Sequence, residues 1–351
     1  MKQNLLGGLT PREFLRRHWQ KRPLYVRGAL PRFKGVLDAR QLLTLARRDD
    51  VESRIVERRG TRRSTAHGPF ARLRPKLRDW TLLVSGVNLH HAAADALLRR
   101  FSFIPQARLD DVMVSYATPG GGVGPHVDSY DVFLLQGAGR RRWTVTGPGK
   151  KSVYTAHPGD LLYLPPGWRH DGVALDACFT YSIGFRAPRG AELGAAFLDW
   201  LHERGLPDAS YRDPRLAPAS RPGRIPAQML GFASRALGRI RWTSRDVAGF
   251  LGEYLSLPKA QLVFRGPPRP RRPRRLAGAM VHLDLKSQLL YSGRRFFING
   301  EIVTVPEGAA AALRRLADER CASGDALVRA RLAPLMSDWQ RRGYVSVHRG
   351  K

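Results

Sequence analysis

The stretch PGGGVGPHVDSYDVFLLQGAGRRRW, residues 119–143, contains the features that decide the fold. A glycine-rich turn comes first, followed by His126 and Asp128 and then by the apolar run at 132–135. In an extended strand, residues i and i+2 project to the same side, so both polar side chains can reach one metal ion. The apolar run is typical of a buried strand. The stretch therefore predicts a metal site supported by a β-sheet.

A third ligand is expected from residues 157–170, HPGDLLYLPPGWRH, in which two turns flank a short apolar strand. His157 and His170 are both candidates. Two neutral imidazoles and one carboxylate on one face of a metal leave three positions open, which is the arrangement of non-haem Fe(II) oxygenases. A His-x-Asp pair by itself is more often a hydrogen-bonded surface pair. The glycine-rich turn, the basic strand end at 140–142 and the second histidine segment together favour the metal site.

Five motifs occur together in the first part of the chain, at residues 14–23, 67–70, 119–143, 159–167 and 181–188. With them the sequence resembles the JmjC-type cupin oxygenases, and specifically the bacterial ribosomal oxygenases that hydroxylate an arginine of ribosomal protein L sixteen. The resemblance rests on the combination, because no single motif carries it. It implies an α+β protein with a double-stranded β-helix (the cupin or JmjC barrel), a helical dimerisation region and a C-terminal winged-helix-like domain.

The resemblance also assigns roles to the residues at the predicted metal site. His126, Asp128 and His170 would hold the iron, and His170 is preferred to His157 because its Pro-Pro-Gly turn matches the family. Arg141 matches the basic position that pairs with the far carboxylate of 2-oxoglutarate. A guanidinium suits this role, since it can bind a carboxylate through two parallel hydrogen bonds. The alternatives are Arg140 and Arg142, which strand alternation turns away from the face of Arg141.

Further polar residues near the site are expected to contact the two substrates. Ser115, Tyr116 and Thr180 would add hydroxyl contacts to the co-substrate. Tyr130 and Asp131 would line the substrate entrance, where a carboxylate attracts a guanidinium. For Asp131 the alternative role is to hold the loop.

The reaction implied by the resemblance is arginine 3-hydroxylation, with Fe(II), 2-oxoglutarate as co-substrate and O2. The expected substrate is ribosomal protein L sixteen or another basic protein. The segment 144–156 is shorter than its counterpart in the resembled family, which leaves the substrate cleft less well defined than the metal site. Two alternatives stay open. The protein could demethylate a basic protein, or it could be a non-catalytic cupin and winged-helix protein that binds nucleic acid or has a regulatory role.

The chain is expected to divide into four parts. Residues 1–188 would form the JmjC/cupin oxygenase domain with its N-terminal helices, and 189–265 a helical region that dimerises. Residues 266–275, rich in proline and arginine, would be a linker. In the winged-helix-like domain at 276–351, Asn299-Gly300 is typical of a β-hairpin turn.

The composition is strongly basic, with a formal net charge of +31 and a pI near 11.4. Such a charge favours a polyanionic partner such as ribosomal RNA, although an arginine-biased composition is the alternative. Residues 110–185 contain seven acidic and six basic residues, so the excess charge lies outside the predicted catalytic core. The two cysteines, the lack of a long apolar stretch and the lack of a secretory signal favour a cytoplasmic protein without a membrane span.

Overall fold

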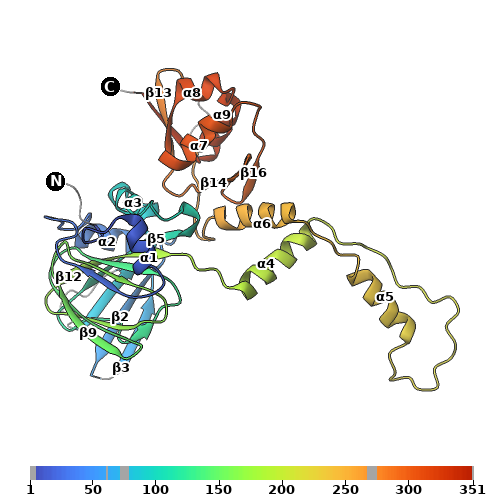
Figure 1. Cartoon of the computed structure of the whole chain (residues 1–351), viewed down its shortest axis with the longest axis horizontal. Helices are drawn as coiled ribbons and strands as arrows, with labels where there is room; N and C mark the ends of the chain where they lie inside the picture. The colour runs from blue at the N-terminus through green and yellow to red at the C-terminus, as the bar shows by residue number, and fades with distance from the viewer. Residues whose placement is uncertain (1–4, 61, 72–78, 267–274, 350–351) are drawn as a thin grey trace.

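A computed structural model describes residues 5–60, 62–71, 79–266 and 275–349 of the chain. Figure 1 shows a β-barrel domain, a helical arm that extends away from it and a separate C-terminal domain. Within the described ranges, no helix is both long enough and apolar enough to cross a lipid bilayer.

The barrel is built from two antiparallel sheets, as predicted for a double-stranded β-helix. The larger sheet contains, in spatial order, β1 (Leu24–Val26), β10 (Leu161–Leu164), β7 (Val132–Gln136), β12 (Cys178–Phe185), β5 (Leu109–Ala117), β4 (Trp80–Val84), β2 (Ser53–Arg59) and β3 (Arg62–His67). The smaller sheet contains β6 (His126–Val127), β11 (Arg169–Ala174), β8 (Arg141–Gly147) and β9 (Lys150–Ala156). The segment 144–156 lies within the β8–β9 hairpin.

The apolar run that begins at Val132 is buried on both faces of the larger sheet. Val132 and Leu134 pack against Trp143 and Val145 of the smaller sheet. Phe133 and Leu135 belong to a second core on the opposite face. Alternation along β7 therefore supplies both cores, which explains why the run is continuously apolar.

Helices cover the outer face of the larger sheet. These are α1 (Pro11–Arg17), α2 (Ala39–Ala46) and α3 (Ala92–Arg99), with the short 3₁₀ helices η1 (Val87–Leu89) and η2 (Gln106–Arg108). Thr10 and Glu13 form a capping box that begins α1, which satisfies backbone N–H groups of the first turn. Phe14 of this helix is fully buried, and its ring centroid lies 5.4 Å from that of Phe133.

The helical arm consists of α4 (Gly190–Glu203), α5 (Ala227–Leu237) and α6 (Ser244–Ser256). Figure 1 shows α5 far from the barrel. No residue of α4 or α5 is fully buried. By contrast, α6 packs against the C-terminal domain, where Ser256 Oγ accepts a hydrogen bond from the Gly300 N–H (3.0 Å).

The C-terminal domain combines two small sheets with three helices around its own apolar core. Its elements are β13 (Ala279–Leu283), β14 (Leu289–Ser292), β15 (Arg295–Ile298), β16 (Glu301–Val303), α7 (Ala310–Glu319), β17 (Cys321–Ser323), α8 (Gly324–Arg329), α9 (Ala333–Arg342) and β18 (Val345–Arg349). Asn299 and Gly300 form the predicted two-residue turn, with φ of 51° and 88°, the positive values that a type I′ turn requires. Most of the predicted linker, residues 267–274, lies outside the described residues.

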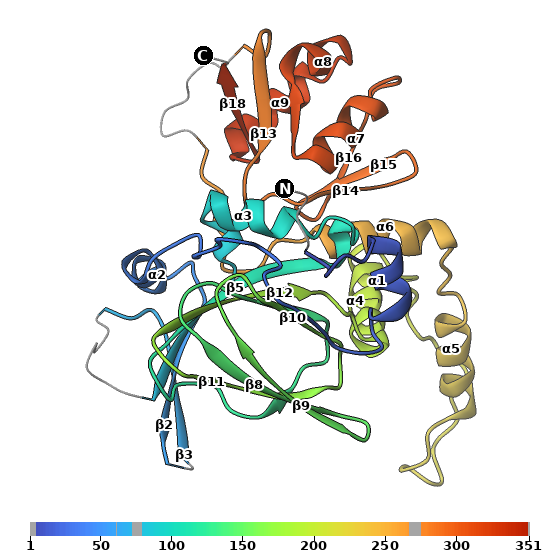
Figure 2. The same cartoon turned by 60° about the vertical axis from the view of Figure 1, so that its left-hand side comes forward.

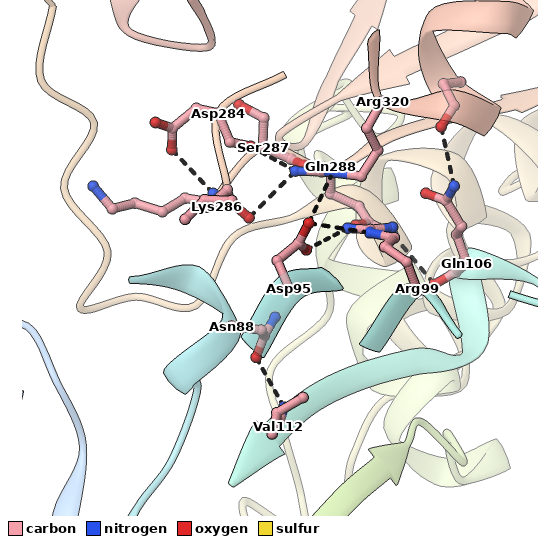
Figure 3. A network of polar contacts seen from close by, with 12 residues as sticks. Asn88, Asp95, Arg99, Gln106, Val112, Asp284, Lys286, Ser287, Gln288 and Arg320 are labelled. Carbon is pink, nitrogen blue, oxygen red and sulfur yellow. Dashed lines mark hydrogen bonds and ion pairs between the residues drawn. The ribbon is translucent and has the colours of Figure 1, made fainter. Parts of the chain in front are cut away.

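Polar contacts attach the C-terminal domain to the α3 side of the barrel (Figures 2 and 3). The buried Arg320 guanidinium donates to the carbonyl oxygens of Ser287 (2.8 Å) and Asp284 (2.6 Å). Its Nε lies 4.0 Å from the Asp95 carboxylate on α3. Gln106 Nε2 donates to the Ala317 carbonyl oxygen at 3.0 Å. The two domains therefore share a hydrogen-bonded interface.

Candidate metal centre and co-substrate cavity

The structure brings the three predicted metal ligands together inside the barrel. His126 lies on β6 and is directly opposite His170 on β11, and Asp128 follows β6. His126 Nε2 is 3.7 Å from Asp128 Oδ1, and His170 Nε2 is 3.6 Å from Asp128 Oδ2. The ligand atoms of all three residues lie within 4.8 Å of one another. Two imidazoles and a carboxylate in this arrangement fit a divalent iron-type metal.

Backbone carbonyls orient both histidine rings. Nδ1 of His126 lies 2.8 Å from the Gly124 oxygen, and Nδ1 of His170 lies 3.0 Å from the Trp168 oxygen. A neutral ring that donates from Nδ1 presents the lone pair of Nε2 to the metal. Burial lowers the pKa of His170, which favours this neutral form.

The glycine-rich turn before His126 fits tightly between neighbouring backbones. A Cβ on Gly122 would lie 2.3 Å from the Gly172 carbonyl oxygen of β11, and one on Gly121 would lie 2.4 Å from the Trp80 oxygen of β4. Only glycine allows so close an approach. The turn thus sets the position of the two ligands that follow it.

Arg141 lies at the buried end of the same cavity. It is 4% exposed, and its Nη1 donates to two neutral hydroxyls, Ser115 Oγ at 3.3 Å and Thr180 Oγ1 at 3.2 Å. Its Nε has no hydrogen-bond partner within the described chain. Burial lowers the pKa of Arg141. A buried guanidinium with an unsatisfied N–H is costly, so a ligand carboxylate fits this end of the cavity.

Neither alternative arginine is placed to take this role. Arg140 points to the surface and pairs with Asp176 at 2.8 Å, and Arg142 is exposed. The predicted alternation along β8 therefore holds.

The prediction for Tyr116 is corrected by the structure. Its side chain lies on the face of β5 opposite Ser115 and packs against Trp80 and Phe179, with ring centroids 5.8 and 5.0 Å away. Successive residues of a strand point to opposite faces, so Ser115 and Tyr116 cannot both face the cavity. Ser115 does so, directly opposite Thr180 of β12.

The prediction that Asp131 lines the substrate entrance is also wrong. Its side chain is fully buried and accepts hydrogen bonds from Tyr163 Oη (2.6 Å) and Gln20 Nε2 (3.1 Å). Arg108 Nη2 lies 3.5 Å away. Asp131 therefore has the alternative role of holding the loop, while its neighbour Tyr130 lines the cavity.

His157 lies outside the metal cavity. It lines a separate surface pocket with Tyr154 and Asp160, and its backbone N–H donates to Asp160 Oδ2 at 2.9 Å. The structure thus places His170, rather than His157, beside His126 and Asp128.

The cavity has a volume of about 300 Å³ and reaches from Arg141 past the metal ligands to an acidic wall. This wall contains Glu52, Asp110 and Asp111. Lys259, from the segment after α6, lies 3.2 Å from Asp111 Oδ2 and 3.6 Å from Asp110 Oδ1. Sequence reasoning missed these residues, although Asp111 shares a strand face with Ser115 by alternation. Lys259 carries no local signal, because only the fold brings it here.

Comparisons with known proteins agree with the barrel and its site. A JmjC domain family matches residues 96–157 and 153–193, and a ROXA-like winged helix family matches residues 239–340, a range that includes α6. The ribosomal protein uL16 3-hydroxylase of Escherichia coli K12 is 33% identical over 318 residues, which cover 84% of this chain and 85% of that protein. A probable ribosomal oxygenase of Haemophilus influenzae is 36% identical over 214 residues, covering 53% of this chain and 52% of that protein.

Solved structures match over nearly the whole chain. The structure of YcfD, a ribosomal oxygenase from Escherichia coli, in complex with cobalt and 2-oxoglutarate has a TM-score of 0.83 and 32% identity, covering 97% of this chain and 98% of that one. The fold and the site define a JmjC-domain protein with a double-stranded β-helix and a winged helix, as predicted. At the level of identity found, the chain belongs to the ribosomal oxygenases.

Proposed function

We propose that this protein is an Fe(II)- and 2-oxoglutarate-dependent hydroxylase that acts on an arginine side chain of ribosomal protein uL16, the L sixteen protein expected from the sequence. The observation that carries the proposal is the His126–Asp128–His170 cluster, which shares one cavity with the buried, incompletely hydrogen-bonded Arg141. The Escherichia coli relatives support the same chemistry, since one is a uL16 3-hydroxylase and the other is an oxygenase solved with cobalt and 2-oxoglutarate.

Each end of the cavity has a separate role. His126, Asp128 and His170 hold Fe(II), and Arg141 binds the far carboxylate of 2-oxoglutarate with the help of Ser115 and Thr180. When bound, the metal and the co-substrate supply the activation of O2 that hydroxylation of a carbon requires. The apolar side chains of Val132, Leu134 and Trp143 line the same cavity.

The acidic wall suits a cationic substrate side chain. Asp111 is buried, and it accepts hydrogen bonds from the Gly86 N–H at 2.7 Å and from Lys259 at 3.2 Å. Burial raises the pKa of Asp111, and the Lys259 ammonium opposes that shift. Glu52 and Asp110 complete the wall, and Asp110 Oδ1 lies 3.6 Å from both Lys259 and Arg186. A substrate guanidinium would share the three carboxylates with these cations. Tyr130, 40% exposed, offers an aromatic surface beside the wall.

The helical arm is assigned to homodimerisation. Leu198 and Leu237 are 60% and 68% exposed, and Trp242 is 54% exposed. Large exposed apolar side chains on a projecting arm mark an interaction surface, which the proposal assigns to a second copy of the chain. Light scattering is expected to give twice the monomer mass of 39.3 kDa, and L198E/L237E to give the monomer. A monomeric wild type would refute this assignment.

The cytoplasm is the assigned location, and the basic surface is assigned to contact with ribosomal RNA. Cys178 and Cys321 are both free thiols, in keeping with a reducing compartment. Within the protein, the excess positive charge lies outside the catalytic core.

The activity is tested by succinate formation from 2-oxoglutarate with purified protein, Fe(II) and O2. Turnover that requires Fe(II), 2-oxoglutarate and O2 supports the proposal if it also increases with a uL16 peptide and is lost in H126A. The absence of both turnover and metal binding would instead favour a non-catalytic scaffold. Loss of a methyl group from a methylated peptide, without oxygen incorporation, would indicate demethylation.

A further inference from the structure

The β2–β3 hairpin forms an exposed arginine-rich edge of the larger sheet. All six residues of β3 are exposed, and Arg54, Arg58, Arg62 and Arg63 of the hairpin are exposed as well. Figures 1 and 2 show the hairpin projecting from the lower end of the barrel. Edge strands with charged side chains resist pairing with other strands, but that function does not require arginines to gather on one face.

The register of the strands places three of these arginines on the face that continues the wall of the metal cavity. On β4, Thr81 and Leu83 line the cavity, and Leu83 lies directly opposite Arg54 on β2. By alternation, Arg54 and Arg58 share this face. Arg58 is directly opposite Arg63 on β3, which extends the same face to the edge of the sheet.

The arginine strip, defined as Arg54, Arg58 and Arg63, begins at the cavity and passes close to the metal loop. Arg54 itself lines the cavity. The Arg63 guanidinium lies against Gly124, where a Cβ would be 2.0 Å from Arg63 Cζ. Gly124 is two residues before the metal ligand His126. A partner bound to the strip therefore lies beside the catalytic cavity.

The strip carries positive charge that the described chain does not neutralise. Like charges directly opposite each other in a sheet are destabilising, and Arg58 and Arg63 form such a pair. Within the described residues, neither forms an ion pair with a carboxylate, and Arg58 instead donates to the Gly60 carbonyl oxygen at 3.2 Å. An anionic partner would remove this repulsion.

We propose that the arginine strip binds the phosphate backbone of RNA next to the catalytic cavity. A guanidinium binds phosphate oxygens through two hydrogen bonds, and the acidic wall of the same cavity takes the substrate cation. A basic protein loop held on RNA presents a cationic side chain for the acidic wall and, beside it, RNA phosphates for the arginine strip. The choice of RNA over other polyanions rests on the proposed function, whereas the binding itself does not require hydroxylation.

The test is fluorescence anisotropy with a short labelled duplex RNA and metal-free protein, titrated at several salt concentrations. R58Q/R63Q is expected to raise the Kd about 10-fold or more near 0.1 M salt and to reduce the slope of log K against log salt by about 2. R58K/R63K keeps both charges and is expected to retain most of the affinity. Retained sheet content in circular dichroism shows that the hairpin variant is folded.

The matched control is R294Q/R329Q, which removes the same charge from exposed positions of the C-terminal domain. It is expected to bind RNA nearly as the wild type does. Equal losses in both variants would mean that the binding is spread over the basic surface, and a loss only in the control would place it on the winged helix. Either result overturns the proposal. Because iron and 2-oxoglutarate are absent, a failure of the hydroxylase assay would leave this measurement unaffected.

Discussion

Nε2 of His170 lies 3.6 Å from Oδ2 of Asp128, although the strands β7, β8, β9 and β10 separate the two residues in the chain. Asp128 is the only carboxylate in the cluster that the described residues form.

Replacing Asp128 with alanine is expected to weaken Co(II) binding more than about 100-fold. The loss of a residue that merely orients a metal ligand already costs 10- to 100-fold. Anaerobic calorimetry measures this. D176A, which removes a surface carboxylate paired with Arg140, should bind as the wild type does. Similar affinity in D128A would contradict the assignment.

Arg141 is expected to set the affinity for 2-oxoglutarate. The R141K variant keeps the charge but loses the guanidinium that donates two parallel hydrogen bonds, so the KM for 2-oxoglutarate should rise about 10-fold or more. R142K, at the exposed neighbouring position, is the control and should leave the KM unchanged. An equal KM in R141K and the wild type would mean that the carboxylate is bound elsewhere.

Asp111 is expected to act on the peptide rather than on the co-substrate. Removing its charge in D111N should lower kcat/KM for an arginine-containing peptide about 10- to 100-fold, the loss typical of a buried charged contact. Peptide-independent succinate formation should change little. The more exposed Asp110 is the comparison, and D110N should have a smaller effect. A parallel fall in succinate formation without peptide would show that Asp111 supports the metal site instead.

His90 is expected to make stability depend on pH. Burial, with the nearby Arg48, lowers its pKa to about 4, below the value of about 6.5 in an unfolded chain. The unfolded state therefore binds more protons between these pH values, and stability falls as the pH falls from 6.5 towards 4. Between pH 7.5 and pH 5, the wild type should lose about 1 kcal/mol more than H90N, after allowance for partial exposure of the ring. Urea unfolding at both pH values measures the difference, and equal losses would contradict it.

Much of the barrel follows from local sequence patterns. The buried strand expected from the apolar run at 132–135 corresponds to β7, and the turn expected at Asn299-Gly300 joins β15 to β16. Glycine and proline turns limit these elements, and continuous apolar runs identify buried strands. The order of strands in the sheets has no such local signal. For example, β1 pairs with β10, a contact that long-range packing determines.

The site shows the same division between local and long-range information. Because His126 and Asp128 are two residues apart, their side chains are predicted to project to the same side of the extended chain. The prediction for Tyr116 rests on residue type and ignores the alternation of its own strand. The prediction for Asp131 rests on proximity to the metal pair, although its partner Tyr163 lies on another strand. Lys259 reaches the cavity from beyond α6. Such contacts depend on how distant segments pack, so single-sequence reasoning does not find them.

The most direct test of the central claim is the mass of a uL16 peptide after incubation with the protein, Fe(II), 2-oxoglutarate and O2. We expect a gain of one oxygen, about 16 Da, located on an arginine by fragmentation and absent with H126A. Lack of this product, when the protein binds Fe(II) and uL16 peptide, would contradict the account.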